Sequence, residues 1–313
     1  MAGAIGLCLL IPSANIDLGG INASDPDLPT ALPTFTPLPK PTKPNIGRII
    51  FTCTRGDFNQ LCIVNADGTG YRQITNVQAH NYYPVYSPLG GSIVYASNQN
   101  GGYFDLFLFI FEGSRLLRLT ENIGNVISPS FSPDGNTILF ANRAADGPTA
   151  LWTVANTGKD PTLLYAGPNT IVAADWSPDG STIAFAMAVE RPDAYEIFLM
   201  DADGSNVRQL TRGLAGVGGS LDWSPDGKYL LIYAGPPGDK DIFLVNVEAK
   251  TASQLTDGGN NAACSFSPDG QWIAFNSLRN DEQADIFIMR ADGSSMRQIT
   301  DDPEPDWQPQ WEP

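Results

Sequence analysis

Two aspartates occupy matching places in this sequence. Asp175 precedes Trp176 and Asp222 precedes Trp223, and each tryptophan opens the run Trp-Ser-Pro-Asp-Gly. Two carboxylates that a fold brings together can hold a hydrated Ca²⁺ or share one proton. The alternative is that each carboxylate accepts hydrogen bonds from backbone amides or water. Ca²⁺ at Asp175 and Asp222 is the only metal or cofactor that the sequence suggests.

Signatures of enzymes are scarce. The sequence has no Gly-x-Ser-x-Gly elbow, no His-Glu-x-x-His and no glycine-rich phosphate loop. Its one histidine, His80, leaves little scope for a Ser/His/Asp triad, and its four cysteines show no Cys-x-x-Cys spacing. A formal net charge of −16 argues against a nucleic-acid partner, which needs a basic patch. We expect a protein without catalytic activity.

Both aspartates lie in a repeat, which is an aromatic residue followed by Ser-Pro-Asp-Gly. The aromatic residues of the successive copies are Tyr86 (in a degenerate copy), Phe131, Trp176, Trp223, Phe266 and, at the end of the chain, Trp311. A spacing of 43 to 47 residues is typical of propeller blades. Proline, aspartate and glycine favour a tight turn, and strand-like stretches flank it, so each copy predicts a hairpin.

The repeat predicts an all-β protein. Five units of four strands are expected at about 82–120, 127–165, 173–211, 220–256 and 263–300. A first unit has only three expected strands, at 48–54, 61–65 and 71–75, and residues 306–313 form an isolated strand. We therefore predict a six-bladed β-propeller of four-stranded antiparallel blades, in which the C-terminal strand completes the N-terminal blade and closes the ring.

The repeats resemble those of TolB-like six-bladed β-propellers, which are WD40-like repeat proteins. The resemblance lies in the segments Pro129–Gly135, Trp223–Gly227, Ile197–Gly204 and Ile286–Gly293, and it covers about residues 47–313. It implies the propeller fold and a protein or peptide partner in the cell envelope. TolB itself binds the peptidoglycan-associated lipoprotein in the periplasm. It has an N-terminal domain before its propeller, and in this chain we expect a spacer at that place.

The N-terminal part of the chain has two expected segments. Residues 1–24 contain a short apolar run and are either disordered or the remnant of a signal or membrane anchor. Residues 25–46 are rich in proline and threonine, which favours a semi-rigid spacer. Residues 47–313 form the propeller. We expect a monomer at the periplasm or cell surface, with the N-terminus as a possible membrane tether.

The variable connections predict a binding surface. The Ser-Pro-Asp-Gly turns share one face of the disc, and the longer connections, which vary between units, share the other. We expect eight residues to bind a partner there: Tyr82, Tyr103, Phe104, Arg143, Arg191, Lys240, Arg279 and Trp307. Of these, Tyr82 and Trp307 should lie nearer the channel mouth. The alternative is that these residues are solvated loop tips.

The first strand of each unit alternates in character. Its aromatic residues should pack between blades, and the residues just before them should face the axial channel: Val85, Ser130, Asp175, Asp222, Ser265 and Gln310. We therefore expect a non-catalytic, protein- or peptide-binding propeller. The alternative is an enzyme or a carbohydrate-binding propeller that uses the acidic channel mouth.

Two cysteines lie close enough in sequence to pair. Cys53 and Cys62 fall on adjacent expected strands of the first unit. In an oxidising compartment they can form a disulfide, and two buried free thiols are the alternative.

Overall fold

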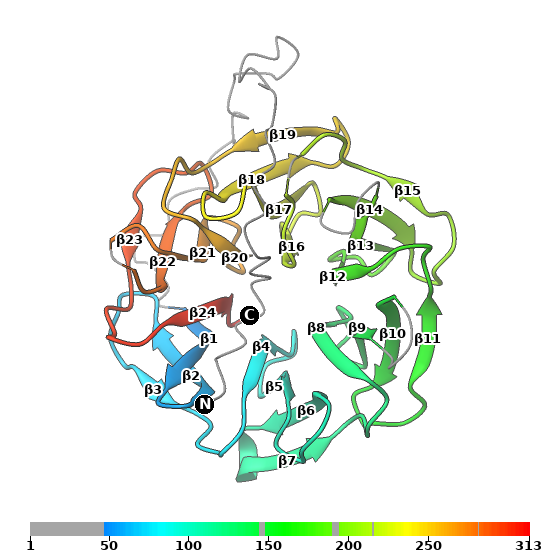
Figure 1. Cartoon of the computed structure of the whole chain (residues 1–313), viewed down its shortest axis with the longest axis vertical. Helices are drawn as coiled ribbons and strands as arrows, with labels where there is room; N and C mark the ends of the chain where they lie inside the picture. The colour runs from blue at the N-terminus through cyan, green and yellow to red at the C-terminus, as the bar shows by residue number, and fades with distance from the viewer. Residues whose placement is uncertain (1–46, 144–147, 190–193, 215, 281) are drawn as a thin grey trace.

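The chain folds as a six-bladed β-propeller (Figure 1). The computed structural model describes residues 47–143, 148–189, 194–214, 216–280 and 282–313. Six four-stranded antiparallel sheets stand around a central axis like the blades of a fan. This confirms the expected fold class and blade count. The expected segments 1–24 and 25–46 lie outside the described residues.

The strand bounds follow the repeat. Blade 1 combines β24 (Asp306–Trp311) with β1 (Arg48–Arg55), β2 (Phe58–Asn65) and β3 (Arg72–Gln73). Blade 2 contains β4 (Asn81–Tyr86), β5 (Ser92–Ser97), β6 (Asp105–Ile110) and β7 (Arg115–Arg118), with the 3₁₀ turn η1 (Glu112–Ser114) before β7. Blade 3 contains β8 (Asn125–Phe131), β9 (Thr137–Arg143), β10 (Ala150–Ala155) and β11 (Thr162–Tyr165).

The other three blades have the same order. Blade 4 contains β12 (Ile171–Trp176), β13 (Thr182–Ala188), β14 (Tyr195–Asp201) and β15 (Arg208–Gln209). Blade 5 contains β16 (Leu221–Trp223), β17 (Tyr229–Ala234), β18 (Asp241–Asn246) and β19 (Thr251–Gln254). Blade 6 contains β20 (Ala262–Phe266), β21 (Trp272–Ser277), β22 (Asp285–Arg290) and β23 (Arg297–Gln298). In the described residues, no helix is long and apolar enough to cross a membrane.

The C-terminal strand closes the ring. β24 pairs antiparallel with β1, so that Ile49 faces Trp311 and Cys53 faces Asp306. Figure 1 shows β24 as the innermost strand of blade 1, in the place that β4, β8, β12, β16 and β20 take in the other blades. The pairing covers the inner edge of β1, which would otherwise expose unpaired backbone groups.

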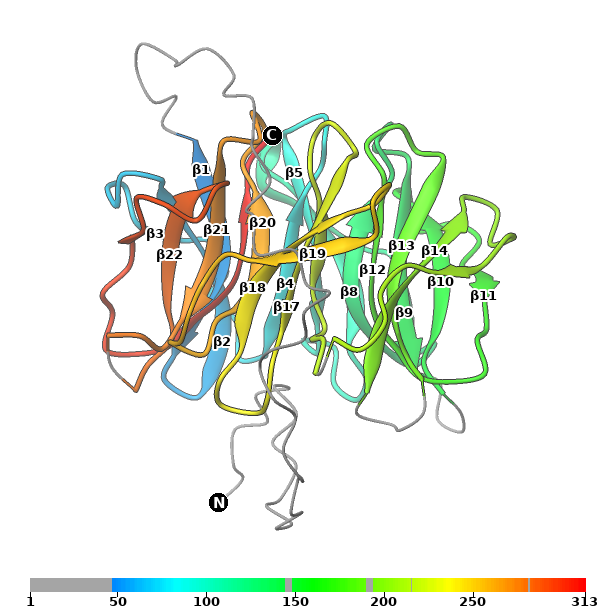
Figure 2. The same cartoon turned by 90° about the horizontal axis from the view of Figure 1, so that it is seen from above.

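Each Ser-Pro-Asp-Gly turn is held by its own side chains. Ser132 Oγ donates to Asp134 Oδ1 at 2.6 Å, and Gly135 N donates to Ser132 O at 2.8 Å. Gly135 has a φ of 71°, a conformation that glycine adopts without a steric penalty. These turns lie at one end of the strands (Figure 2), which we call the turn face. We call the opposite end the loop face.

Most of the innermost strands contain a β-bulge. The register shifts in β4, β8, β12, β20 and β24, and Tyr83, Ser128, Ala263 and Gln308 have positive φ there. Proline follows three of these four residues, and an innermost edge strand tolerates it because its missing N–H faces no partner strand. The bulge bends the strand and increases its twist at the place where its side chains turn to the channel.

The core lies between neighbouring blades. Trp223 of blade 5 packs in one cluster with Ala173 and Ala184 of blade 4, and Phe131 of blade 3 packs with Val94 and Leu106 of blade 2. The aromatic residue of each repeat is therefore a wedge between two sheets, as expected from the alternation.

The first blade carries a disulfide. Cys53 on β1 and Cys62 on β2 are bonded, with their Cα atoms 5.8 Å apart. The third described cysteine, Cys264, is buried and free.

Candidate functional site at the channel mouth

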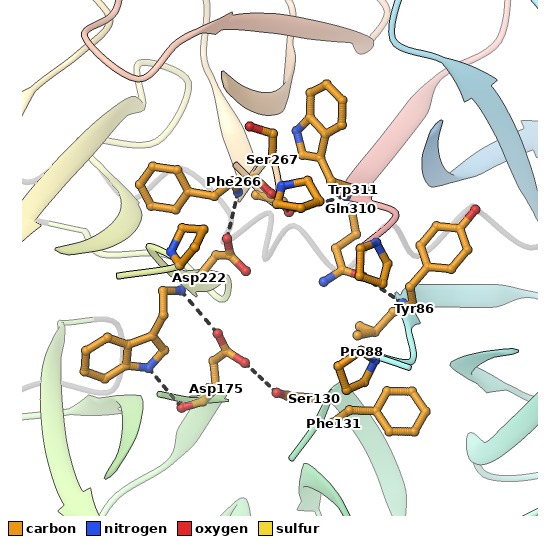
Figure 3. A pocket seen from close by; sticks show the side chains of 16 residues that line it. Tyr86, Pro88, Ser130, Phe131, Asp175, Asp222, Phe266, Ser267, Gln310 and Trp311 are labelled. Atoms are coloured by element: carbon orange, nitrogen blue, oxygen red, sulfur yellow. Dashed lines mark hydrogen bonds between the residues drawn. The ribbon is translucent and has the colours of Figure 1, made fainter. Parts of the chain in front are cut away.

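A cavity of about 210 Å³ opens at the centre of the turn face. Its wall includes the residue before the aromatic in every blade: Val85, Ser130, Asp175, Asp222, Ser265 and Gln310. The expectation that this alternating set faces the channel is confirmed. Figure 3 shows the labelled members of the set directed inward, with aromatic residues and the prolines of the turns around them.

Asp175 is tied to three neighbours. Its Oδ1 accepts hydrogen bonds from Ser130 Oγ of blade 3 and from its own neighbour Trp176 N, the latter at 3.0 Å. Its Oδ2 accepts from Trp223 N of blade 5 at 3.3 Å. The carboxylate therefore links three successive blades across the channel.

Asp222 is tied at one oxygen only. Its Oδ2 accepts from Phe266 N of blade 6 at 2.7 Å. Among the described residues no donor reaches Oδ1, which is open to the cavity. Gln310 makes the same kind of contact two blades further on, between blades 1 and 2, because its Oε1 accepts from Tyr86 N at 2.8 Å. Bonding to backbone amides, the alternative stated above for Asp175 and Asp222, is thus present, and one carboxylate oxygen remains unused.

The two carboxyls hold their protons more tightly than ordinary aspartates. Protein surrounds them on every side except the cavity, and this burial raises the pKa of Asp175 to about 6. Burial also raises the pKa of Asp222, and the negative charge of Asp175 raises it further. At neutral pH the pair favours any positive group or proton that lies between its oxygens.

Further carboxylates lie in the turns of the turn face, outside the lining of the cavity, and we call them the rim. The turns between the first and second strands contribute Asp134, Asp179, Asp226 and Asp269, and the turns between the third and fourth strands contribute Asp67, Asp203 and Asp292. The serine hydroxyls of their own turns lower the pKa of Asp134 and Asp179, which keeps both ionised. The turn face therefore presents negative charge around a negatively charged centre.

The residues predicted to bind a partner lie elsewhere. Of those that the structure describes, none lines the cavity, because they belong to the connections and strand ends of the loop face. Tyr103 and Arg143 are exposed there, as expected of contact residues. Arg191 lies outside the described residues. Binding of a partner by the loop-face residues stays a prediction, and it concerns a second surface.

Several loop-face side chains are engaged within the chain. Lys240 Nζ donates to Gly216 O at 2.6 Å and to Gly235 O at 3.0 Å. Arg279 lies over the rings of Phe275 and Phe287 and donates to Asn261 Oδ1 at 3.0 Å. These two cations brace loops, and their bonds make them poorer candidates for contact with a partner than Tyr103 and Arg143.

The aromatic residues of the loop face form their own group. Tyr82 stacks on His80 with ring centroids 6.0 Å apart, and it contacts Phe104 at 5.6 Å. Asn59 Nδ2 donates to Tyr82 Oη at 2.5 Å. Trp307, on β24, is partly buried.

Comparison with known proteins agrees with the fold and the repeat. The sequence profile of the TolB beta propeller domain matches residues 72–215 and 158–313. The chain belongs to the TolB β-propeller family. Residues 72–313 of this TolB-type propeller fall within the two matches, which include every Ser-Pro-Asp-Gly turn.

Relatives match over shorter stretches. An uncharacterized protein of Agrobacterium fabrum is 37% identical over 114 residues, which is 36% of this chain and 38% of that protein. The Tol-Pal system protein TolB of Anaeromyxobacter dehalogenans is 30% identical over 117 residues, or 37% of this chain and 26% of the relative. The matched part thus spans well under half of these relatives.

Solved structures share the TolB-type propeller. TolB from Acinetobacter baumannii superposes with a TM-score of 0.74 at 21% identity, over 85% of this chain and 66% of that one. An oligogalacturonate lyase in complex with manganese reaches a TM-score of 0.57 at 15% identity, over 81% of this chain and 74% of that one. At these identities the likeness is one of fold.

Proposed function

We propose that this propeller is a non-catalytic binding protein of the cell envelope that holds a basic segment of a protein partner at its turn face. One observation carries the proposal: Asp175 and Asp222 direct carboxylate oxygens into a cavity at the centre of a face ringed by acidic turns. A lysine or arginine side chain of the partner supplies the positive group that this pair favours.

The size of the cavity fits a side chain. Sites for drug-sized molecules commonly enclose about 300–1,000 Å³. The cavity here holds about 210 Å³. It therefore suits one inserted side chain of a peptide, with the rest of the segment lying over the prolines and aromatic residues at the mouth.

The charge of the rim supports the same partner. Carboxylates of one sign gathered on a face raise the local concentration of cations and speed their association. Asp134 and Asp179 keep their charge well below neutral pH, because hydrogen bonds lower the pKa of each. A basic segment would be attracted by the rim before its side chain reaches the cavity.

The proposed location in the cell envelope rests on the relatives and on the disulfide. The relatives named Tol-Pal system protein TolB support an envelope role with a protein partner. A bonded Cys53–Cys62 pair favours an oxidising compartment such as the periplasm or the cell surface. We further propose that the propeller acts as a monomer and that its N-terminal segment tethers it to a membrane.

Ca²⁺ is the alternative occupant that we propose for the same oxygens. This ion takes about 6–8 oxygen ligands, so the single open oxygen of Asp222 leaves most of its coordination to water. Among the described residues, no group of three or more histidine, cysteine or acidic side chains stands ready to hold a metal ion. A cationic side chain needs fewer partners.

Binding of short peptides tests the proposal. Fluorescein-labelled peptides that differ only in a central lysine, arginine, norleucine or glutamate should be titrated with the protein, and anisotropy recorded. We expect the two basic peptides to bind and the other two not to bind. Equal binding of lysine and norleucine peptides would reject the role of charge. Competition by Ca²⁺ or by oligogalacturonate in the same assay separates an ion site or a carbohydrate site from a peptide site.

A further inference from the structure

A buried carboxyl without a hydrogen bond stands where the ring closes. Asp306 is the first residue of β24, and its side chain is 0% exposed. Its backbone N donates to Ala284 O at 2.6 Å. Neither of its carboxyl oxygens accepts a hydrogen bond from any residue that the structure describes. A buried, charged acceptor in this state is costly.

The same position carries an amide in two other blades. Asn261 N donates to Lys240 O at 2.7 Å, as Asp306 N does to Ala284 O, and both carbonyls directly precede the acid that starts the third strand of a blade. Asn81 stands six residues after Thr75, as Asp306 stands six residues after Thr300. The structural repeat therefore places Asp306 at a buried position that holds an amide in blades 2 and 6 and the apolar residues Val126 and Ile171 in blades 3 and 4. No other blade named here places an acid at this position.

The amide at this site is a donor. Asn261 Nδ2 donates to Asp241 Oδ1 at 3.1 Å and to Thr256 Oγ1 at 3.0 Å. Asn81 Nδ2 donates to Gln60 Oε1 at 3.3 Å. An ionised carboxylate has no proton to donate, whereas a protonated carboxyl has one. Only the neutral form of Asp306 can reproduce the contact.

The charged groups that face Asp306 are mostly negative. Asp285 begins β22 and already accepts from Gln298 Nε2 at 2.8 Å and from Thr300 Oγ1 at 3.3 Å. Among the described residues, the cation that pairs with Asp306 is Arg55 on β1. Its Nη1 lies 3.9 Å from Asp306 Oδ1, and its Nη2 donates to Asp302 at 2.8 Å.

These surroundings act on the acidity of Asp306. Burial raises the pKa of Asp306 to about 7, the nearby Thr300 hydroxyl and Arg55 lower it, and the Asp302 and Asp285 carboxylates raise it. The Thr300 hydroxyl lies close to Asp306, but its geometry makes its hydrogen bond to Asp285 and leaves the Asp306 oxygens without one. The connection before β24 also contains Asp301 and Glu304, and Glu304 accepts a hydrogen bond from Gly56 N at 2.9 Å. The preference of Asp306 for its neutral form thus follows from burial and from its acidic neighbours.

We propose that Asp306 makes the closure of the propeller sensitive to pH. In its protonated form the Asp306 carboxyl donates a hydrogen bond to the Asp285 carboxylate and stabilises the position of the start of β24. Asn261 stabilises the start of β20 in the same way, by donating to Asp241. When the proton passes to solvent, a buried negative charge faces Asp285 and the attachment of β24 to its neighbours weakens. Gln310 and Trp311, on the same strand, line the cavity. If the cavity binds as proposed above, loss of this proton also reaches the binding site.

The sign of the effect on stability follows from proton counts. Between about pH 4, the ordinary range of aspartate, and the folded-state value, the native chain holds a proton that the unfolded chain has lost. Stability contributed by this group therefore falls as pH rises through that window and levels off above it. The size of the effect is measured against a variant that keeps the shape and lacks the charge.

Asp306→Asn is that variant. Melting temperatures of both proteins should be measured from pH 5 to pH 9 without peptide, so that the result is independent of the proposed binding role. We expect the melting temperature of the variant, relative to that of the wild type, to increase as pH rises. At pH 8 the variant should melt roughly 5 °C higher than the wild type, since about 1 kcal/mol moves the melting temperature of a domain of this size by about 2–4 °C. Parallel profiles, with a constant difference at all pH values, would overturn the proposal.

A second measurement, on the wild-type chain, tests the proposal even if Asp306→Asn does not fold. The ¹³C chemical shift of the Asp306 carboxyl in the wild-type chain reports its titration directly. A midpoint near neutral pH supports the proposal, and a midpoint below pH 5 overturns it. Asn81→Asp is the matched gain-of-charge control: it places an acid at the equivalent site and should introduce a fall in melting temperature with rising pH.

Discussion

Asp222 accepts a 2.7 Å hydrogen bond from the backbone N of Phe266, the aromatic residue of the next blade. The bond spans two blades and leaves Asp222 Oδ1 open to the cavity. A single side chain thus fastens the ring and presents charge to the channel. The two roles can be separated by experiment, because an amide oxygen can accept the same backbone bond without carrying the charge.

The first prediction concerns pH and binding. Burial raises the pKa of Asp175 and of Asp222, so acid converts the pair to a form that cannot attract a cation. The affinity for a lysine peptide should therefore rise between about pH 5 and pH 7.5. Anisotropy titrations across this range measure it. An affinity that does not change with pH would show that the carboxyl pair takes no part in binding.

The second prediction concerns the closing strand. Trp311 is 6% exposed and packs with Ile49 and Phe51 of β1. Removal of a buried tryptophan side chain costs roughly 3–5 kcal/mol. Trp311→Ala should lower the melting temperature by roughly 10 °C, and truncation after Pro305 should give aggregated or poorly folded protein. A truncated chain as stable as the full one would contradict closure by β24.

The third prediction concerns the disulfide between Cys53 and Cys62. Reduction should make both cysteines available to alkylation in unfolded protein, and intact-mass analysis should detect the difference. The bond closes a short loop, for which chain entropy predicts a stabilisation of about 2–3 kcal/mol. Two alkylatable thiols at these positions in native, exported protein would contradict the bond.

The fourth prediction concerns the loop face. Tyr103 and Arg143 are exposed, so Tyr103→Ala together with Arg143→Ala should leave the melting temperature within a few degrees. Phe104 is left unchanged because it packs on Tyr82. We expect the double variant to bind a lysine peptide as the wild type does. Loss of peptide binding in this variant would move the site to the loop face.

The repeat made most of the fold predictable. Proline, aspartate and glycine at a fixed spacing marked each hairpin turn, and the aromatic residue before them marked the side of the strand that packs between blades. The same alternation placed Asp175 and Asp222 in the channel, because a strand sends successive side chains to opposite sides. The isolated strand at 306–313 indicated how the ring closes.

Details that depend on neighbouring blades were not predictable in the same way. From the sequence, Lys240 and Arg279 were expected to contact a partner. In the fold, Lys240 donates to the carbonyl of Gly216, and Arg279 lies over the ring of Phe287. The cavity opens on the face with the short turns, whereas the variable connections had favoured the opposite face for binding. A signal for Asp306 was present: the repeat aligns it with Asn81.

The most direct test of the proposed function is a double substitution in the cavity. Asp175→Asn with Asp222→Asn keeps oxygens that can accept from Trp223 N and Phe266 N, so the variant should fold. Loss of a buried charge partner commonly costs about 2–5 kcal/mol of binding energy. We predict that the variant binds a lysine peptide at least about tenfold more weakly than the wild type, with Tyr103→Ala/Arg143→Ala as the control. Unchanged affinity in the folded cavity variant would contradict the account.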